Sequence, residues 1–204
     1  MNPLEIDTPF GLARAHLEHV DDPTGALVLG HGAGGGITAR DLVAAAHAAH
    51  SAGLSVALVE QPYRVAGRRS PAPSRQLDAA WTAVMEHLRA GGLRGLPLVA
   101  GGRSSGARVA CRTAQATGAV GVLCLAFPLR PPRRSGAAPA ASRLAELDAV
   151  TVPMLVVQGS RDRFGMPPST ERRTVVQVAG DHSLRTDLGT LEEAVRAWLL
   201  RVVG

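Results

Sequence analysis

The chain has 204 residues, of which 46% are hydrophobic, so it can bury the core of one globular domain (residues 1–204) and is not a disordered polypeptide. The formal net charge is +5 and all 22 basic residues are arginine, but no basic run is interleaved with aromatic residues, so we expect no binding to nucleic acid. No apolar run approaches the roughly 18 residues of a membrane span, and the start MNPLEIDTPF shows no signal-peptide pattern, so we expect a cytoplasmic protein without a membrane partner.

The first part of the chain predicts an edge hairpin followed by a buried strand. Residues 3–20 alternate loosely around a turn at residues 8–11. Residues 26–30 (ALVLG) form a short apolar strand, as expected where helices cover both faces of a parallel sheet. The glycine run HGAGGG, residues 31–36, follows at once. At the carboxyl end of a buried strand such a run leaves backbone N–H groups free to face a site, as an oxyanion hole requires.

The next segments predict a helix, a strand and a second helix. Thr38 and Asp41 resemble a capping box that opens an alanine-rich helix through about His50. Residues 55–60 predict another buried strand, and an arginine-rich loop over residues 61–76 follows it. The second helix has an apolar stripe at helical spacing, which consists of Leu77, Ala80, Trp81, Val84 and Leu88.

The segment LVAGGRSSGARVA, residues 98–110, contains the motif G-x-S-x-G between a short apolar strand and a helix of small residues. This context is typical of a nucleophile elbow, in which a serine lies on a sharp, strained turn. Strand and helix pack so closely there that glycine is needed two residues either side of the serine. The register favours Ser104 over Ser105, because a motif centred on Ser105 would need glycine at Arg103.

The remainder predicts three strands and a final helix. The strands are expected at residues 119–127, 151–159 and 174–179. Thr190 with Glu193 resembles a capping box at the start of the last helix. Cys111 and Cys124 both lie in apolar segments, which favours buried reduced thiols over a disulfide. Because strands and helices alternate from residue 26 onward, the fold class is α/β, with a mostly parallel sheet and helices on both faces.

Three polar residues follow three of these strands closely. They are Ser104, Asp162 in GSRDRFG and His182 in AGDHSLR. Ligands of an open α/β sheet bind beyond the carboxyl ends of its strands, so all three are expected at one edge. The chain order serine, aspartate, histidine is that of α/β-hydrolases.

Two other aspartates compete with Asp162 for the acidic position. Asp148 precedes its strand and so belongs to the opposite end of the sheet. Asp181 adjoins His182 in sequence, which makes a productive side-chain geometry awkward. We therefore favour Asp162.

Several motifs together resemble the small α/β-hydrolases of the dienelactone-hydrolase-like group, especially an uncharacterised bacterial subfamily. The motifs are HGAGGG, QPYRVAGRR, GGRSSGARVA, PLRPP, VVQGSRDRFG and AGDHSLR. The resemblance runs from about residue 26 to the carboxyl terminus and implies an α/β-hydrolase fold with a Ser104, Asp162, His182 triad. The nucleophile of dienelactone hydrolase itself is a cysteine, so its substrate does not carry over. No insertion is long enough for a full cap domain, which favours a shallow site with loop walls.

The residue types predict a serine hydrolase that acts through a covalent acyl-enzyme. A serine hydroxyl is a weak nucleophile, so His182 would take its proton and later return it to the leaving group, while Asp162 would orient the imidazole. Backbone N–H groups of Ser105, and of Ala33 or Gly34, would receive the oxyanion. The expected substrate is a small ester; a thioester, amide or lactone would suit the same groups.

The alternative function is a catalytically silent domain used as a binding or assembly module. Some eukaryotic relatives of the resembled subfamily are subunits of chromatin-modifying assemblies, so this alternative stays open. An intact triad argues against it, because a scaffold does not need a serine, an acid and a histidine at three separate strand ends.

Aromatic and basic residues beyond the strand ends suggest where the substrate binds. Tyr63, Phe127 and Phe164 follow strands and are expected to line an acyl or alcohol pocket. Two loops at the same edge carry arginines, namely Arg64, Arg68, Arg69, Arg130, Arg133 and Arg134. These arginines are either a cationic rim that favours anionic substrates or solvated side chains in a chain without lysine.

The histidines other than His182 do not predict acid–base or metal chemistry. His31 opens the glycine run and is expected to brace that loop by hydrogen bonding. The others are interpreted as surface or helix-face residues and are His16, His19, His47, His50 and His87. Because no pair has the spacing of metal ligands, we expect no metal and no cofactor. The pattern favours no particular oligomeric state.

Overall fold

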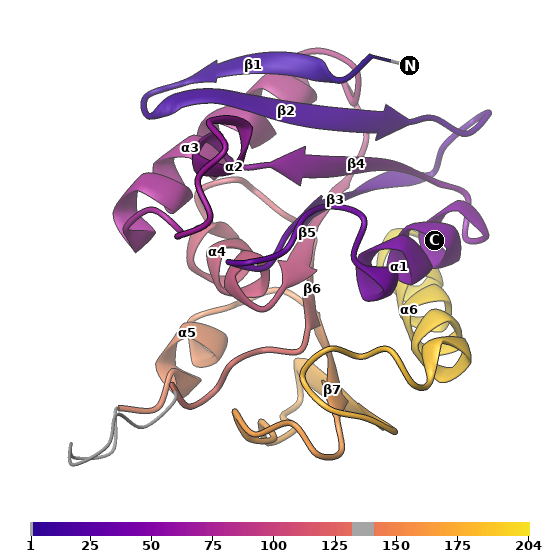
Figure 1. Cartoon of the computed structure of the whole chain (residues 1–204). Helices are drawn as coiled ribbons and strands as arrows, with labels where there is room; N and C mark the ends of the chain where they lie inside the picture. The colour runs from indigo at the N-terminus through magenta and orange to yellow at the C-terminus, as the bar shows by residue number, and fades with distance from the viewer. Residues whose placement is uncertain (1, 132–140) are drawn as a thin grey trace.

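The computed structural model describes residues 2–131 and 141–204, which form an eight-stranded sheet in the order β1-β2-β4-β3-β5-β6-β7-β8 (Figure 1). The strands are β1 (Leu4–Thr8), β2 (Gly11–Glu18), β3 (Gly25–Gly30), β4 (Leu54–Glu60), β5 (Leu98–Arg103), β6 (Gly121–Leu125), β7 (Met154–Gly159) and β8 (Arg173–Val178). The helices are α1 (Arg40–His50), α2 (Pro62–Val65), α3 (Ser74–Ala90), α4 (Ser105–Thr113), α5 (Leu144–Asp148) and α6 (Leu188–Val203).

The sheet is mostly parallel, as the alternation of strands and helices predicts. Strand β2 runs antiparallel to both β1 and β4, and all the other neighbouring strands are parallel. The predicted edge hairpin is present, with β1 and β2 joined at a turn where the Thr8 hydroxyl donates to the Gly11 carbonyl at 2.6 Å. Because β3 to β8 all point the same way, the loops that follow them meet at one edge of the sheet.

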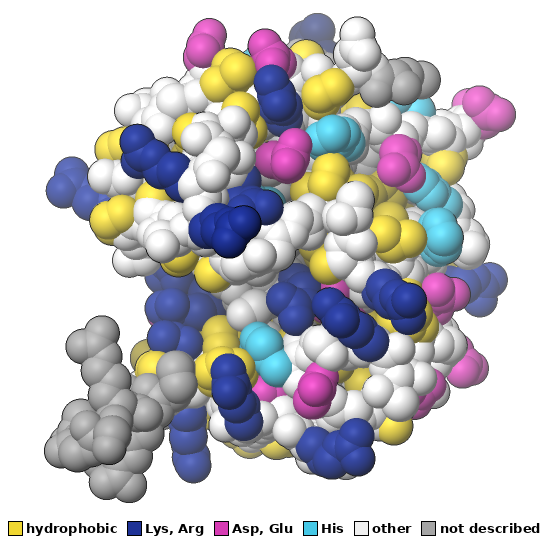
Figure 2. Space-filling view, in the orientation of Figure 1, with side chains coloured by type: hydrophobic (Ala, Val, Ile, Leu, Met, Phe, Trp, Pro, Cys, Tyr) yellow, Lys and Arg dark blue, Asp and Glu magenta, His cyan; other side chains and the backbone are white. Residues whose placement is uncertain are grey.

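Helices cover both faces of the sheet, and α1 and α6 lie together on one face while α3, α4 and α5 lie on the other (Figure 1). Each face has its own apolar cluster between helices and strands. On the outer surface, basic side chains gather across the middle of the face shown in Figure 2. Within the described part of the chain, no helix combines the length and apolar character needed to cross a bilayer.

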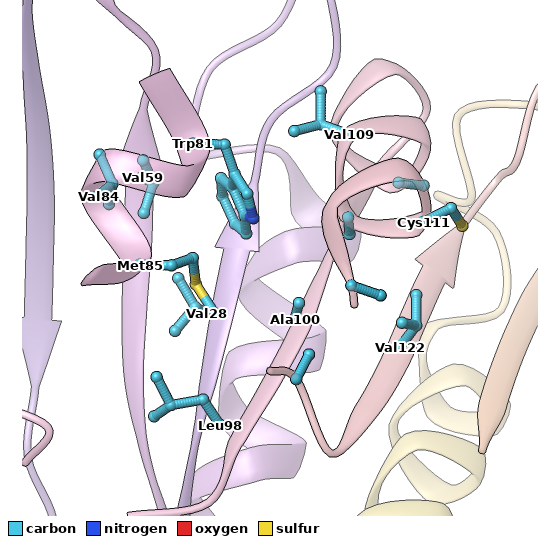
Figure 3. Packing of buried hydrophobic residues seen from close by; sticks show 14 of the residues in the cluster. Val28, Val59, Trp81, Val84, Met85, Leu98, Ala100, Val109, Cys111 and Val122 are labelled. Atoms are coloured by element: carbon cyan, nitrogen blue, oxygen red, sulfur yellow. The ribbon is translucent and has the colours of Figure 1, made fainter. Parts of the chain in front are cut away.

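Trp81 of α3 is the centre of the larger cluster and packs beside Met85 of the same helix (Figure 3). Val109 of α4 and Val28 of β3 belong to the same buried cluster (Figure 3). Burying a large apolar side chain stabilises the fold by roughly 1.5–3 kcal/mol, so this cluster fixes α3 and α4 against the strands that lead to the site.

The two cysteines are free buried thiols, as expected from their apolar surroundings. Cys111 of α4 and Cys124 of β6 have sulfur atoms 3.4 Å apart. Their hydrogen bond and their burial raise the pKa of the Cys124 thiol well above its usual value. A raised pKa disfavours the thiolate, the reactive form, so Cys124 serves the packing of α4 on the sheet, to which the buried side chain of Cys111 also contributes.

The two predicted capping boxes are wrong. The residue before α1 is Ala39, and no side chain caps this helix. Asp41 is buried and faces Arg103 instead, so a tertiary contact replaces the local one. At the start of α6 the cap is Asp187, whose side chain accepts from the Thr190 N–H at 3.3 Å. Thr190 therefore lies inside the helix.

The segments between strands contain two short helices that the sequence pattern did not predict. Helix α2 directly follows β4, and α5 precedes β7. Among the described residues, no segment between strands forms a separate cap domain over this edge. The site is therefore walled by loops and by the short helix α2.

Candidate active site

The turn between β5 and α4 holds Ser104 in a strained conformation, with φ 52° and ψ −104°. The flanking glycines are required by the backbone of β3. A Cβ on Gly102 would lie 2.5 Å from the carbonyl oxygen of Gly30, and a Cβ on Gly106 would be closer still. Carbonyl atoms of a central strand cannot move cheaply, so the glycine spacing selects the register that centres the motif on Ser104.

The structure brings together the three polar residues that the sequence places at one edge. The Oγ of Ser104 lies 2.9 Å from Nε2 of His182. Nδ1 of the same ring lies 2.8 Å from Oδ2 of Asp162. The Asp162 side chain is fully buried, whereas His182 is 20% exposed, so the imidazole joins a buried carboxylate to a serine that solvent can approach.

The carboxylate of Asp162 accepts hydrogen bonds through both oxygens. Besides contacting His182, its Oδ2 accepts from Nε2 of Gln158 at 2.8 Å, and its Oδ1 accepts from the Phe164 N–H at 2.9 Å. Gln158 is fully buried at the end of β7. Sequence reasoning missed it, although a polar residue in the otherwise apolar run MLVVQG is a visible signal.

The two rival aspartates do not contact His182. Asp148 forms an ion pair with Arg173 at 3.0 Å. The exposed Asp181 accepts from the Ser183 N–H at 2.8 Å, and hydrogen bonds from Ser183 lower its pKa below the ordinary value. The favoured choice of Asp162 agrees with this geometry.

The aromatic residues of the predicted pocket lie in different environments. The ring of Phe164 packs edge-on against the His182 imidazole, with centroids 4.4 Å apart. The prediction that Phe127 lines the pocket is wrong, because its side chain is fully buried in the core cluster of the sheet and has no surface for a substrate. Its carbonyl accepts from Nε2 of Gln158 at 3.1 Å, so the backbone of Phe127 supports the site while the ring does not line it.

The glycine run after β3 lies directly beside the serine. A Cβ on Gly32 would be 3.7 Å from the Cβ of Ser104. Among the described residues, the N–H groups of Ala33, Gly34 and Ser105 have no hydrogen-bond acceptor. Free N–H groups from the loop and from the first turn of α4 are the donors that a developing oxyanion would need.

His31 and Tyr63 hold this loop in place. The Nδ1–H of His31 donates to the carbonyl of Gly32 at 2.9 Å, and its Nε2 accepts from the Gln61 N–H at 3.1 Å, an arrangement that requires neutral imidazole. The Tyr63 hydroxyl donates to the carbonyl of Ala33 at 2.9 Å. Burial raises the pKa of Tyr63 to about 12, so this donor keeps its proton. Tyr63 therefore supports the loop through its hydroxyl.

We expect His31→Gln to flatten the dependence of stability on pH. Burial lowers the pKa of His31 below its ordinary 6.5, so below that pH the unfolded chain binds a proton that the folded chain resists. The free energy of unfolding should therefore fall as pH drops from 7.5 to 5.5, by at most about 1.4 kcal/mol per pH unit for one proton. Urea denaturation of both proteins at several pH values measures this difference, and parallel pH profiles would contradict it.

The arginines expected at the rim lie in different surroundings. Nη1 of Arg64 contacts the carbonyl of Arg68 at 3.4 Å. Arg130 is exposed, and its backbone N–H donates to the carbonyl of Phe164 at 2.8 Å. Arg133 and Arg134 lie outside the described residues. No contact among those described ties the side chain of Arg130 to the triad residues.

Arg103, the variable residue of the motif before the serine, connects three segments of the site. Its Nε lies 2.8 Å from Oδ2 of Asp41, at the start of α1. Its Nη2 donates to the backbone carbonyl of His182 at 3.0 Å. The Asp41 side chain is only 1% exposed, and burial raises its pKa against the opposing effect of Arg103. Arg103 thus links the serine turn to the helix after the glycine run through an ion pair and to the histidine loop through a hydrogen bond.

The remaining histidines lie apart from the triad residues. His16 pairs with Glu60 at 3.1 Å, and His50 pairs with Glu18 at 3.5 Å. Across residues 2–131 and 141–204, no three histidine, cysteine or carboxylate side chains gather closely enough to hold a metal ion.

Comparisons with known proteins give a family and a fold. Residues 23–193 match the family model of an alpha/beta hydrolase domain. A lidless α/β serine hydrolase of Xanthomonas campestris superposes with a TM-score of 0.76 and 20% identity, over 99% of this chain and 94% of that chain. The esterase Pf2001 of Pyrococcus furiosus superposes with a TM-score of 0.77 and 14% identity, over 100% of this chain and 93% of that chain. A dienelactone hydrolase of Anabaena variabilis superposes with a TM-score of 0.75 and 14% identity, over 100% of this chain and 98% of that chain. None of the curated proteins matches this chain significantly.

Proposed function

Because the chain belongs to the alpha/beta hydrolase domain family, we propose that it is a serine hydrolase that cleaves an ester through a covalent acyl-enzyme. One observation carries the proposal: a continuous line of hydrogen bonds joins Asp162, His182 and Ser104. One fold can host unrelated activities, so this geometry is the main argument. Among the similar structures, the esterase supports an ester as the bond that is cleaved, and the serine hydrolase supports a serine nucleophile.

The first step is attack by Ser104 on the ester carbonyl. Nε2 of His182, 2.9 Å from the hydroxyl, takes its proton as the Oγ–carbon bond forms. Asp162 keeps the proton of the ring on Nδ1, so that Nε2 presents a lone pair to the serine, and it stabilises the imidazolium that results. The strained turn keeps the hydroxyl at the tip of the elbow, where a substrate can reach it.

The oxyanion would be stabilised by backbone donors on two segments. Ser105 offers an N–H at the start of α4, and Ala33 or Gly34 offers a second from the glycine run. His182 then protonates the leaving alcohol, which departs and leaves the acyl group on the serine. Water, activated by the same imidazole, releases the acid and restores the hydroxyl. Losing one such donor typically slows the reaction by a hundredfold or more.

The substrate is proposed to be a small molecule that enters from the loop-walled edge. The chain is proposed to act as one domain of residues 1–204, since the eight strands of its described part join one sheet. Thioesters, amides and lactones present the same electrophilic carbonyl, and relative rates distinguish them from esters. The binding-module alternative requires none of the hydrogen bonds that join the three residues.

A fluorophosphonate probe is expected to label Ser104, because such probes react with serines whose neighbouring base is in place. Peptide mapping locates the label. Labelling should disappear in His182→Ala and persist in His87→Ala, which removes an exposed histidine of α3. A folded protein that remains unlabelled would favour the binding module, and a label at another serine would contradict the assignment of the nucleophile.

A further inference from the structure

A hollow of about 300 Å³ adjoins His182, and the steps above do not use it. Its lining residues are Arg103, Arg161, Arg163, Asp181, His182 and Ser183. Half of these side chains are arginines, and none of the three belongs to the rim expected from the sequence. The hollow is therefore a basic surface next to the residue that exchanges protons with the substrate.

Two of the three arginines around the hollow form no ion pair among the described residues. Arg103 is balanced by Asp41 at 2.8 Å. Asp181 also lines the hollow and offsets one positive charge, and the charge of Arg161 helps to stabilise its carboxylate. Within the described residues, no carboxylate forms an ion pair with Arg163. The hollow thus has an excess of positive charge, located at Arg163.

Arg163 stacks on an aromatic ring that also contacts the imidazole. Its guanidinium carbon lies 5.0 Å from the centroid of Phe164. The same ring packs edge-on against His182 at 4.4 Å. A cation stacked on a ring loses less freedom when it binds an anion than a free surface arginine does. Arg163 is therefore a preorganised cation close to the reacting atoms.

The chemistry of the first step determines which part of an ester occupies the hollow. As the bond from Oγ of Ser104 to the acyl carbon forms and the bond from that carbon to the ester oxygen breaks, the departing oxygen takes the proton held on Nε2 of His182. The alcohol portion must therefore leave past the imidazole. The glycine run lies beside Ser104, the hollow adjoins His182, and Arg103 contacts both, since a Cβ on Gly32 would lie 2.8 Å from its Nη1.

We propose that this hollow binds a negatively charged group, a carboxylate or a phosphate, on the alcohol portion of the ester, with Arg163 as its main partner. The inference rests on the proposed function and assigns a substrate class to that same site. Arg103, which also lines the hollow but is already paired with Asp41, is the second cation beside it.

The test compares two esters whose leaving alcohols are matched in size and shape and differ in charge. We expect kcat/KM for 4-acetoxybenzoate to exceed that for the neutral 4-acetoxybenzamide by about fivefold, the effect of one exposed ion pair. Arg163→Gln should bring this ratio close to one, whereas Arg196→Gln, which removes an exposed arginine of α6, should preserve it. Added salt should lower the ratio for the unaltered protein. Comparison with 4-acetoxyphenyl phosphate identifies which anion is preferred.

Other outcomes overturn the inference or the proposed function separately. Equal kcat/KM for the two acetates, or an unchanged ratio in Arg163→Gln, contradicts the inference. The enzyme could instead prefer 4-nitrophenyl succinate over 4-nitrophenyl butyrate and show no preference for 4-acetoxybenzoate. This result would place the anionic group on the acyl portion of the ester and would also contradict the inference. If no ester is cleaved, the proposed function fails. Binding of 4-hydroxybenzoate against 4-hydroxybenzamide, followed by NMR, then decides the inference: a preference for the anion that is lost in Arg163→Gln supports it, and equal binding contradicts it.

Discussion

Ser104→Ala is expected to lower kcat for ester hydrolysis by about a millionfold, leaving only the rate that the oxyanion donors and substrate binding supply. The reason is that Oγ is the atom within 2.9 Å of Nε2 of His182, and alanine removes it without altering the elbow. Alanine also tolerates the backbone at this position no worse than serine does. The measurement is steady-state hydrolysis of a short-chain nitrophenyl ester, with urea denaturation to establish that the variant is folded.

The matched control is Ser105→Ala, one residue further along the same turn. Ser105 contributes its backbone N–H to the proposed oxyanion hole, and alanine keeps that group, so kcat should stay within about tenfold of the unaltered protein. Equal losses in the two variants would mean that the turn, and not one hydroxyl, is sensitive. A large loss in Ser105→Ala alone would place the nucleophile one residue later.

The serine turn could be predicted from sequence because its constraints are local. A Cβ at Gly102 or Gly106 collides with the backbone of β3, so any chain that makes this turn shows the glycine spacing. The edge position of Asp162 and His182 was predictable for a related reason, since both follow apolar strands that had to be parallel. Local pattern and sheet topology together were sufficient for these three residues.

The supporting contacts were not predictable, because they join segments that are distant in sequence. Arg103 was interpreted as the variable residue of a motif, and Asp41 as part of a capping box, whereas they form one buried ion pair. A carboxylate in a first helical turn fits either interpretation until the tertiary partner is known. The same limit applies to Phe127, whose place after a strand does not reveal whether its ring faces the core or the edge.

The arginines illustrate a different limit. The composition shows many arginines and no lysine, but the position of an arginine in a loop does not reveal what its side chain contacts. Arg130 is exposed and has no assigned partner among the described residues, whereas Arg163 stacks on a ring beside His182. What distinguishes them is the aromatic ring of Phe164, which contacts both the guanidinium of Arg163 and the imidazole of His182. The basic surface of the site therefore became visible only in three dimensions.

Asp162→Asn is expected to lower kcat by about ten-thousandfold while the fold persists. Both oxygens of Asp162 accept from N–H donors, Oδ1 from Phe164 and Oδ2 from Gln158 and His182. An asparagine that keeps its oxygen toward the Phe164 N–H turns its NH₂ toward Nδ1 of the imidazole. That ring nitrogen must then accept, so the proton moves to Nε2, and Nε2 can no longer take the proton of the serine.

Either orientation of the asparagine sets its NH₂ group against one N–H donor. Toward Oδ2 that donor is the Gln158 side-chain amide, which can turn, whereas toward Oδ1 it is the fixed backbone N–H of Phe164, so the opposite orientation is disfavoured and does not rescue the reaction. The control is Asp181→Asn, which changes an exposed carboxylate beside His182 and should retain kcat for a neutral ester within about threefold. A large loss in Asp181→Asn with little loss in Asp162→Asn would mean that the catalytic carboxylate is Asp181. Similar small losses of kcat in both variants would mean that the hydrogen bond to Nδ1 does not control the tautomer of His182. The assignment of His182 as the base that activates Ser104 would then lose its main support.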